Sequence, residues 1–341
     1  MTNSSAVPNI TPRLQAVDFT KGALVFFMVV YHSLNYSTQY YLSFKYLAFL
    51  PPSFIFITGF LIARVYFQRS PGSDRATSHR MVVRGIKLLA IFTALNVLAT
   101  FVATRDYNGQ SLNLPVFFSL WREIYFQGAG YLVAFDILIP IAYILLIGPL
   151  LLWLSRLKPW IVPTLAIIAM TSLVLSQAFG REITCNVSMM AAGLIGASFG
   201  IIPQSMLNAL SRFWFLPLAI YATLAVVGFR YDAFAQWILA QQAAAVIAVA
   251  ALFALGNRFR KPEWLMDRIV VLGNYSLLAY ITQIGFLQIL VRWTGRFEPN
   301  SFAFLAFFLV ILALTTLSSE MVHWCRTRSP LANNVYRFVF G

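Results

Sequence analysis

The sequence predicts an all-α, polytopic membrane protein with about ten transmembrane helices and cytoplasmic N and C termini. Of its 341 residues, 60% are hydrophobic and only 11% are charged, and the mean hydropathy is +0.74. Soluble domains are typically about 25% charged and less than half apolar. Apolar runs long enough to cross about 30 Å of hydrocarbon as helices recur along the chain. They are continuous rather than alternating, which favours helices over a β-barrel.

The predicted spans follow one another with short connections. They cover residues 18–37, 47–67, 84–104, 129–153, 160–178, 183–203, 213–229, 235–256, 269–293 and 300–323. We expect residues 1–12 to be a disordered cytoplasmic segment, residues 13–325 to form the membrane domain, and residues 326–341 to be a cytoplasmic tail. In the sixth span, Gly193, Gly196 and Gly200 predict close helix packing, since small residues let two backbones approach.

Basic residues set the orientation, because they gather in alternate connections. The richer side holds Arg75, Arg80, Arg156, Arg258 and Arg326, among others. The positive-inside rule places that side in the cytoplasm. The same bias explains the net charge of +14, so we expect no nucleic-acid partner. Cys185 and Cys325 fall on opposite faces in this topology, which disfavours a disulfide, and no metal-binding spacing is present.

The first span carries polar residues on one face. Lys21 and His32 are eleven residues apart, which returns a helix to within about 20° of the same direction. Asp18 lies on the same side, and Asn35 and Tyr36 extend the stripe. Helical rise places His32 about 16 Å further along than Lys21. Polar residues in a membrane helix typically face the bundle interior or a water-filled cavity.

Simpler interpretations of this stripe exist. Lys21 could extend to the cytoplasmic interface and pair with Asp18, which would then be structural. His32 could be a buried core residue. It is, however, the one histidine inside the apolar body of a span, and imidazole can transfer protons near neutral pH. We therefore favour a functional role for His32.

The segment "RLQAVDFTKGALVFFMVVYHS" contains an arginine, an Asp-x-x-Lys-Gly step and a histidine. It resembles the opening of the acyltransferase-3 superfamily of integral-membrane acyltransferases, which has an arginine, an Asp-x-x-Arg-Gly step and a histidine. Arg13, Asp18, Gly22 and His32 match, whereas Lys21 replaces the usual arginine. The charge is kept, but the bidentate geometry of a guanidinium is lost.

Later segments carry further resemblance. Thr58–Phe60 is similar to the family's second-helix Ser-Gly-Phe, and Arg80 and Arg84 match its basic third-helix start, with Met81 where a second arginine often stands. "LGNYSLLAYITQIGFLQ" is similar to a late family helix, with Gln283 where a histidine is often found. The usual Trp-x-x-x-x-Glu signature is absent. The glucan succinyltransferase and heparan-glucosaminide acetyltransferase groups look similar too.

Acyl transfer to a hydroxyl needs a base for that hydroxyl and donors for the developing oxyanion. His32 suits the role of base, and a carboxylate often orients such a base. Asp136 is the carboxylate that the predicted spans place well inside the membrane, so we pair it with His32. Glu123, in the outer connection, is the competing partner, and Asp136 could instead bond a hydroxyl or a helix end.

Acyl-CoA, the donor that the resemblance implies, carries several phosphates. Arg80, Arg84 and Lys87 share one helix face at the cytoplasmic side and, with Lys21, could hold these phosphates. Basic residues gather at such a place in any membrane protein and bind anionic lipid, which is the plainer interpretation. In the ninth span Ser276, Tyr280 and Gln283 share a face and could line a substrate pocket or hold helices together.

The predicted function is therefore acyl transfer from cytoplasmic acyl-CoA to a carbohydrate hydroxyl at or beyond the outer face of the plasma membrane. The catalytic candidates are His32 and Asp136, the donor-binding candidates are Lys21, Arg80, Arg84 and Lys87, and the acceptor candidates are Tyr280, Gln283 and Glu123. The alternative is a proton-coupled transporter or exporter, and a non-catalytic membrane scaffold is a third option. The acyl group, the acceptor and the oligomeric state are left open.

Overall fold

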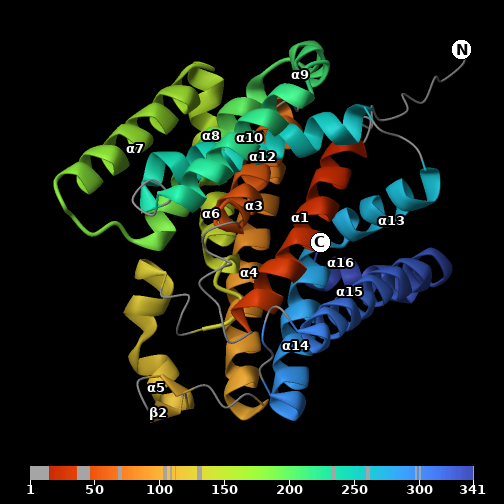
Figure 1. Ribbon diagram of the computed structural model, residues 1–341. Coiled ribbons are helices and arrows are strands. Elements are labelled where there is room, and N and C mark those ends of the chain that lie inside the picture. The colour runs from red at the N-terminus through yellow and green to blue at the C-terminus, as the bar shows by residue number, and fades with distance from the viewer. Residues whose placement is uncertain are drawn as a thin grey trace, which may run out of the picture.

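The computed structural model describes residues 15–36, 47–67, 71–102, 106–107, 110–111, 113–128, 133–231, 236–258, 262–295, 298 and 301–340. These residues form a bundle of helices, with α1, α3, α4 and α14 running through its centre, α7 at one edge, and α15 and α16 at another (Figure 1). Their non-helical secondary structure is one antiparallel pair of two-residue strands, β1 (Asp106–Tyr107) and β2 (Gln110–Ser111). The all-α prediction is confirmed.

The helices occur at the places where the sequence predicts spans. Their bounds are α1 Gln15–Asn35, α3 Leu50–Leu61 with a π-helical extension Ile62–Phe67, α4 Asp74–Val102, α5 Leu114–Ser119, a π-helical turn Glu123–Gln127, α6 Leu138–Leu157, α7 Ile161–Ala178, α8 Cys185–Ile201, α9 Gln204–Ser211, α10 Phe215–Arg230, α12 Ile238–Arg258, α13 Glu263–Asn274, α14 Ser276–Thr294, α15 Phe302–Arg328 and α16 Pro330–Phe340. A short 3-10 turn, Pro71–Ser73, precedes α4.

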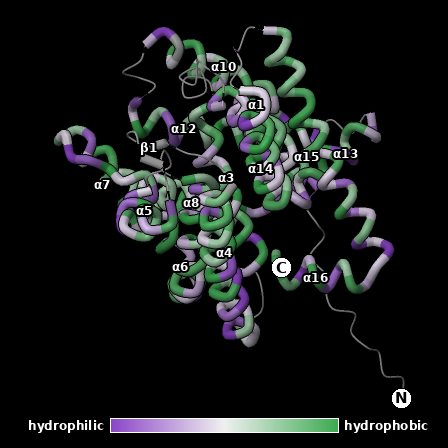
Figure 2. Tube along the Cα trace, turned by 90° about the horizontal axis from the view of Figure 1, so that it is seen from below, coloured by the Kyte–Doolittle hydropathy of each residue, from purple (hydrophilic) through white to green (hydrophobic). Residues whose placement is uncertain are grey.

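Eight of the described helices are long and apolar enough to span a membrane: α1, α3 with its extension, α4, α6, α7, α12, α14 and α15. α8 and α10 are apolar but shorter, at 17 and 16 residues. Hydrophobic residues predominate along the long helices (Figure 2). Large apolar side chains such as Trp153, Ile167 and Leu317 are exposed on them. The chain is therefore a multi-pass membrane protein, because apolar outer faces are stable only against lipid.

Two predicted spans differ from the structure. The fourth was expected to cover 129–153, but α6 begins at Leu138, and residues 133–137 precede it as non-helical backbone. Asp136 therefore lies before the helix and not inside it, as a correction to the prediction. The ninth span, 269–293, is two helices that meet at Tyr275. Residues 1–14, and with them Arg13 and the expected disordered segment, lie outside the described residues.

Glycines bring α3 and α8 into backbone contact. A Cβ on Gly196 would overlap the carbonyl oxygen of Phe56, and one on Gly59 would overlap that of Gly193. The prediction of close packing through the sixth-span glycines is confirmed. α1 and α13 meet in the same way, because added Cβ atoms on Gly22 and Gly273 would overlap the backbones of Ile269 and Asp18.

Polar contacts join helix ends that the predicted topology places on the arginine-rich side. Arg156, at the end of α6, forms a two-bond pair with Asp74, at the start of α4, with N–O distances of 3.0 and 3.1 Å. Arg268 Nη1 lies 2.7 Å from Glu320 Oε1, which joins α13 to α15. The predicted C-terminal tail is mostly helical, since α15 continues to Arg328 and α16 follows it.

Candidate functional site

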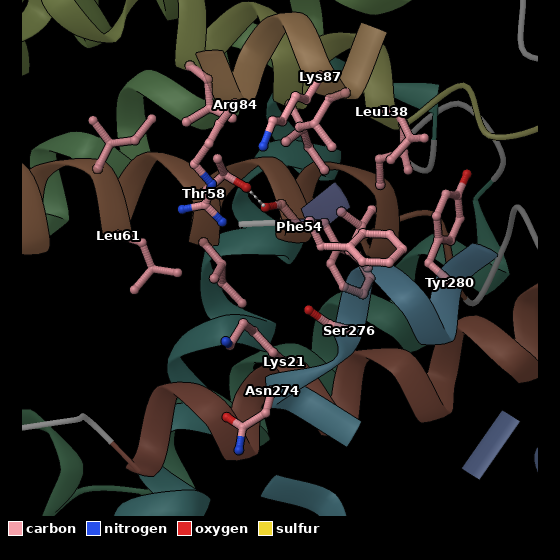
Figure 3. A pocket seen from close by; sticks show the side chains of 18 of the residues that line it. Lys21, Phe54, Thr58, Leu61, Arg84, Lys87, Leu138, Asn274, Ser276 and Tyr280 are labelled. Carbon is pink, nitrogen blue, oxygen red and sulfur yellow. Dashed lines mark hydrogen bonds between the residues drawn. The ribbon is translucent and has the colours of Figure 1, made fainter. Parts of the chain in front are cut away.

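A cavity of about 250 Å³ lies between α1, α3, α4, α6, α14 and α16. Apolar side chains from α3 and α6 form most of its wall, including Phe54, Ile57, Leu138 and Leu145. Its cationic lining residues are Lys21, Arg84 and Lys87. Figure 3 shows Arg84 and Lys87 reaching in from α4, Lys21 across from them, and Tyr280 beside Leu138. The fold thus brings together three of the four predicted donor-binding residues.

Each of the three cations has a described contact. Lys21 Nζ lies 2.7 Å from Asp18 Oδ1, which confirms the predicted pair one turn apart. Arg84 Nη1 donates to the Tyr66 hydroxyl at 3.3 Å. Lys87 Nζ donates to the backbone carbonyl of Phe338 at 2.6 Å, and so binds α4 to the C-terminal helix. Asp18 therefore offsets part of the positive charge, but the cavity remains cationic on balance.

α16 covers this end of the cavity. Tyr336, Val339 and Phe340 line it. The helix is held by Arg326, whose guanidinium donates to Asn333 Oδ1 at 2.9 and 3.1 Å and lies 4.0 Å from the centre of the Tyr336 ring. Burial raises the pKa of the Tyr336 phenol, although the guanidinium groups of Arg326 and Arg84 act against this. The phenol therefore stays neutral at physiological pH.

Tyr280 connects the cavity to His32. The Tyr280 side chain is buried and lines the cavity, and its ring centre is 6.0 Å from that of His32. His32 itself is not one of the described cavity-lining residues; it lies one turn of α1 beyond the lining residue Met28. The polar stripe on α1 thus has Lys21 at the cationic end of the cavity and His32 behind Tyr280.

The backbone before α6 has an unusual conformation next to this tyrosine. Asn96, buried in α4, donates to the Ala134 carbonyl and accepts from its N–H, both at 2.9 Å. Phe135 follows with φ +62°, a region that a bulky residue rarely occupies, and its ring centre is 6.0 Å from that of Tyr280. Asp136 Oδ1 then accepts the N–H of Ile137 at 3.0 Å.

This local structure fixes the position of the Asp136 carboxylate. It interacts electrostatically with the phenols of Tyr31 and Tyr280. Asp136 and His32 therefore share Tyr280 as a neighbour, and their direct pairing stays a prediction. Asn96 was not predictable as a site residue, because an isolated asparagine in an apolar run does not indicate which backbone groups it will bond.

Besides His32 and Asp136, three predicted site residues do not line the cavity. Arg80 is exposed on α4, one turn before Arg84. Glu123 begins the π-helical turn in the connection before α6. Gln283 is fully buried, and neither its amide nitrogen nor its amide oxygen has a hydrogen-bond partner among the described residues. Their predicted roles stay predictions.

The interruption between α13 and α14 adds Asn274 to the cavity lining, a polar residue that the sequence analysis did not single out (Figure 3). Ser276, on the other side of Tyr275, was expected to share a face with Tyr280, and both line the cavity. Gly273 and Asn274 precede the break and are turn-forming residues, but the prediction of one continuous span passed over them.

No protein-family model, curated protein or solved structure matches the chain. The resemblance to the acyltransferase-3 superfamily therefore stays a prediction from the motifs. Among the described residues, no group of three His, Cys, Asp or Glu side chains is placed to hold a metal ion.

Proposed function

We propose that the protein is a membrane-bound O-acyltransferase. It takes an acyl group from cytoplasmic acyl-CoA and transfers it to a carbohydrate hydroxyl at or beyond the outer face of the plasma membrane. The observation that carries the proposal is the cavity itself: cations from α1 and α4 lie at one end, and Tyr280, in contact with His32, lies at the other.

The cationic end suits a polyphosphorylated donor. Charge-assisted hydrogen bonds to phosphate are stronger than neutral ones. Apolar walls keep out most of the water and salt that would otherwise screen these bonds. The cavity volume of about 250 Å³ is below the usual range for a drug-sized ligand. In the proposed complex, therefore, only the acyl end of the donor occupies the cavity, and the nucleotide stays near Arg84 and Lys87.

The proposed chemistry uses His32 as a base. Its imidazole accepts the proton of the acceptor hydroxyl as the hydroxyl oxygen bonds to the thioester carbonyl carbon. The Tyr280 hydroxyl is available to donate to the oxyanion that develops on the carbonyl oxygen. When the carbon–sulfur bond breaks, the imidazolium returns its proton to the departing thiolate. Asp136 stabilises the transient positive charge through the field that it exerts around Tyr280.

The test uses purified protein in lipid nanodiscs with radiolabelled acetyl- and succinyl-CoA and a panel of glycans. We expect transfer to at least one glycan and a loss of about 10²-fold or more in kcat for His32→Ala. His79→Ala is the matched control, since His79 is exposed on α4 outside the cavity. Retained transfer in His32→Ala would remove the base from the mechanism.

The cations and the competing function need separate readouts. The double variant Lys21→Gln/Arg84→Gln is expected to raise the KM for acyl-CoA with little change in the KM for the glycan. Arg75→Gln is the control, since Arg75 is exposed on α4, the helix that carries Arg84, and it should leave both KM values unchanged. Absence of transfer with every donor, together with proton-coupled solute flux into proteoliposomes, would favour the transporter instead.

A further inference from the structure

A second cavity, of about 330 Å³, lies between the starts of α1 and α10, the middle of α3 and the end of α12. The ends of α8 and α9 complete it. Of its described lining residues, Thr20 and Ser211 are the only two that are polar. Both hydroxyls already donate within their own helices, Thr20 to the Ala16 carbonyl at 2.7 Å and Ser211 to the Asn208 carbonyl at 2.6 Å. A polar occupant would lose hydration here without gaining partners, so the cavity favours a hydrocarbon.

α10 forms the outer wall of this cavity. Phe213, Leu216, Pro217 and Ile220 line it, and Phe213, Leu216 and Ile220 are also exposed on the outer surface of the bundle, as are the neighbouring Phe215 and Leu218. α10 is one of the two shorter apolar helices, and it packs mainly against α12. Because this wall is a single helix with lipid beyond it, a chain from the bilayer can reach the cavity by a small movement of α10.

Two arginines lie next to lining residues of this cavity. Arg212 stands between the lining residues Ser211 and Phe213, and Arg258 follows the lining residue Ala254 by one turn of α12. Both arginines are exposed, and neither forms an ion pair with a described residue. Asn257 donates to Ser211 Oγ at 3.3 Å, which holds this end of α12 against α9. Two exposed guanidinium groups next to an apolar cavity match a phosphate joined to an acyl chain.

We propose that this second cavity binds one acyl chain of an anionic membrane phospholipid, with the phosphate at Arg212 and Arg258. The aromatic residues Phe213–Phe215 at the same level are typical of the membrane–water interface, where the headgroup of such a lipid lies. Ile57 of α3 lines both cavities, so the bound chain also supports the wall of the candidate donor site. The proposal does not depend on the acyltransferase activity.

The test is photo-crosslinking in nanodiscs, with phosphatidylglycerol that carries a diazirine near the end of one acyl chain. We expect labelled peptides from residues 213–220 and 246–254. Ala250→Phe fills the cavity and should reduce this labelling by about tenfold, since a chain excluded from the site loses the burial of its methylenes. Ala178→Phe, exposed at the end of α7, is the matched control and should label as the unaltered protein does.

The headgroup is tested without touching the cavity, in case Ala250→Phe misfolds. Arg212→Gln with Arg258→Gln should lower the preference for phosphatidylglycerol over phosphatidylcholine carrying the same chain by roughly thirtyfold, since each basic residue near an anionic headgroup contributes about fivefold. Arg230→Gln, exposed at the other end of α10, should not change it. Equal labelling by the two lipids in the unaltered protein would overturn the proposal. So would unchanged labelling in a folded Ala250→Phe variant, or labelling that free fatty acid competes away better than phosphatidylglycerol does.

Discussion

The same substitution, glycine to alanine, should have opposite effects at two positions of the bundle. At Gly196, the added Cβ would overlap the backbone carbonyl of Phe56 on α3, so α3 and α8 must separate. Overpacking typically costs about 1–3 kcal/mol, and here backbone rather than a side chain must give way, so we expect the upper end of that range. At Gly285 of α14, the added Cβ meets nothing within 4 Å. Alanine should then stabilise α14 by up to about 1 kcal/mol through its helix propensity.

The separation of α3 from α8 also reaches the candidate site. Phe56 and Phe60 of α3 face the glycines of α8, while Ile57 and Leu61 line the cationic cavity. Gly196→Ala should therefore raise the KM for acyl-CoA in addition to lowering stability, whereas Gly285→Ala should leave the KM unchanged. Gly285 is the better control because α14 also contributes Tyr280 to the cavity.

Both effects are measurable on detergent-solubilised protein. Unfolding followed by tryptophan fluorescence gives the stability difference, which we expect to be about 3–4 kcal/mol between the two variants. Two variants of equal stability would show that α3 and α8 do not meet at backbone contact. A destabilised Gly196→Ala with normal donor binding would show that the position of α3 does not control the cavity.

Three further predictions concern the site. Asn96→Ala leaves the buried N–H and C=O of Ala134 unpaired, each at a cost of about 1–3 kcal/mol, and should lower both the unfolding free energy and kcat. The control, Asn186→Ala, removes a donor to the Tyr125 carbonyl and should lower the unfolding free energy alone. Equal losses of kcat in the two variants would contradict a positioning role for Asn96. Lys21→Arg should lower the KM for acyl-CoA by about two- to tenfold, because guanidinium holds phosphate with two bonds, and a rise in KM would place the phosphates elsewhere. Removal of residues 330–340 frees the Lys87 ammonium from the Phe338 carbonyl and should lower the same KM about two- to fivefold, whereas a higher KM would make α16 part of the donor site rather than its cover.

The fold class and the places of the helices follow from the sequence because hydrophobicity decides both. A helix in lipid satisfies its own backbone groups, so a continuous apolar run predicts it without knowledge of its neighbours. The Asp18–Lys21 pair and the glycine contacts of α8 are predictable for a related reason, since each depends on spacing within one helix or on the size of a single residue.

The site is less predictable because it depends on contacts between distant segments. The break at Tyr275 follows Gly273 and Asn274, a short signal inside a long apolar run. It is accompanied by tertiary contacts: the Tyr275 hydroxyl lies 3.2 Å from His323 Nδ1, and Arg326 lies over the Tyr275 ring at 5.4 Å. Periodicity places Arg80 on the same face as Arg84 and Lys87, yet the cavity takes only the latter two, since Arg80 lies one turn beyond it. Hydropathy likewise places Asp136 inside a helix, because Ala134 and Phe135 are apolar whether or not they are helical.

The left-handed backbone conformation of Phe135 determines where Asp136 lies. Such a conformation costs a non-glycine residue about 1–3 kcal/mol and persists where surrounding contacts fix it. Here the Asn96 side chain holds Ala134 on one side, the Leu138 N–H donates to the Phe135 carbonyl at 3.0 Å on the other, and the ring of Phe135 packs on Tyr280. A helical Phe135 would lose these contacts and turn Asp136 away from Tyr280. The strained backbone therefore fixes the Asp136 carboxylate before α6, and the mechanism proposed above depends on that position.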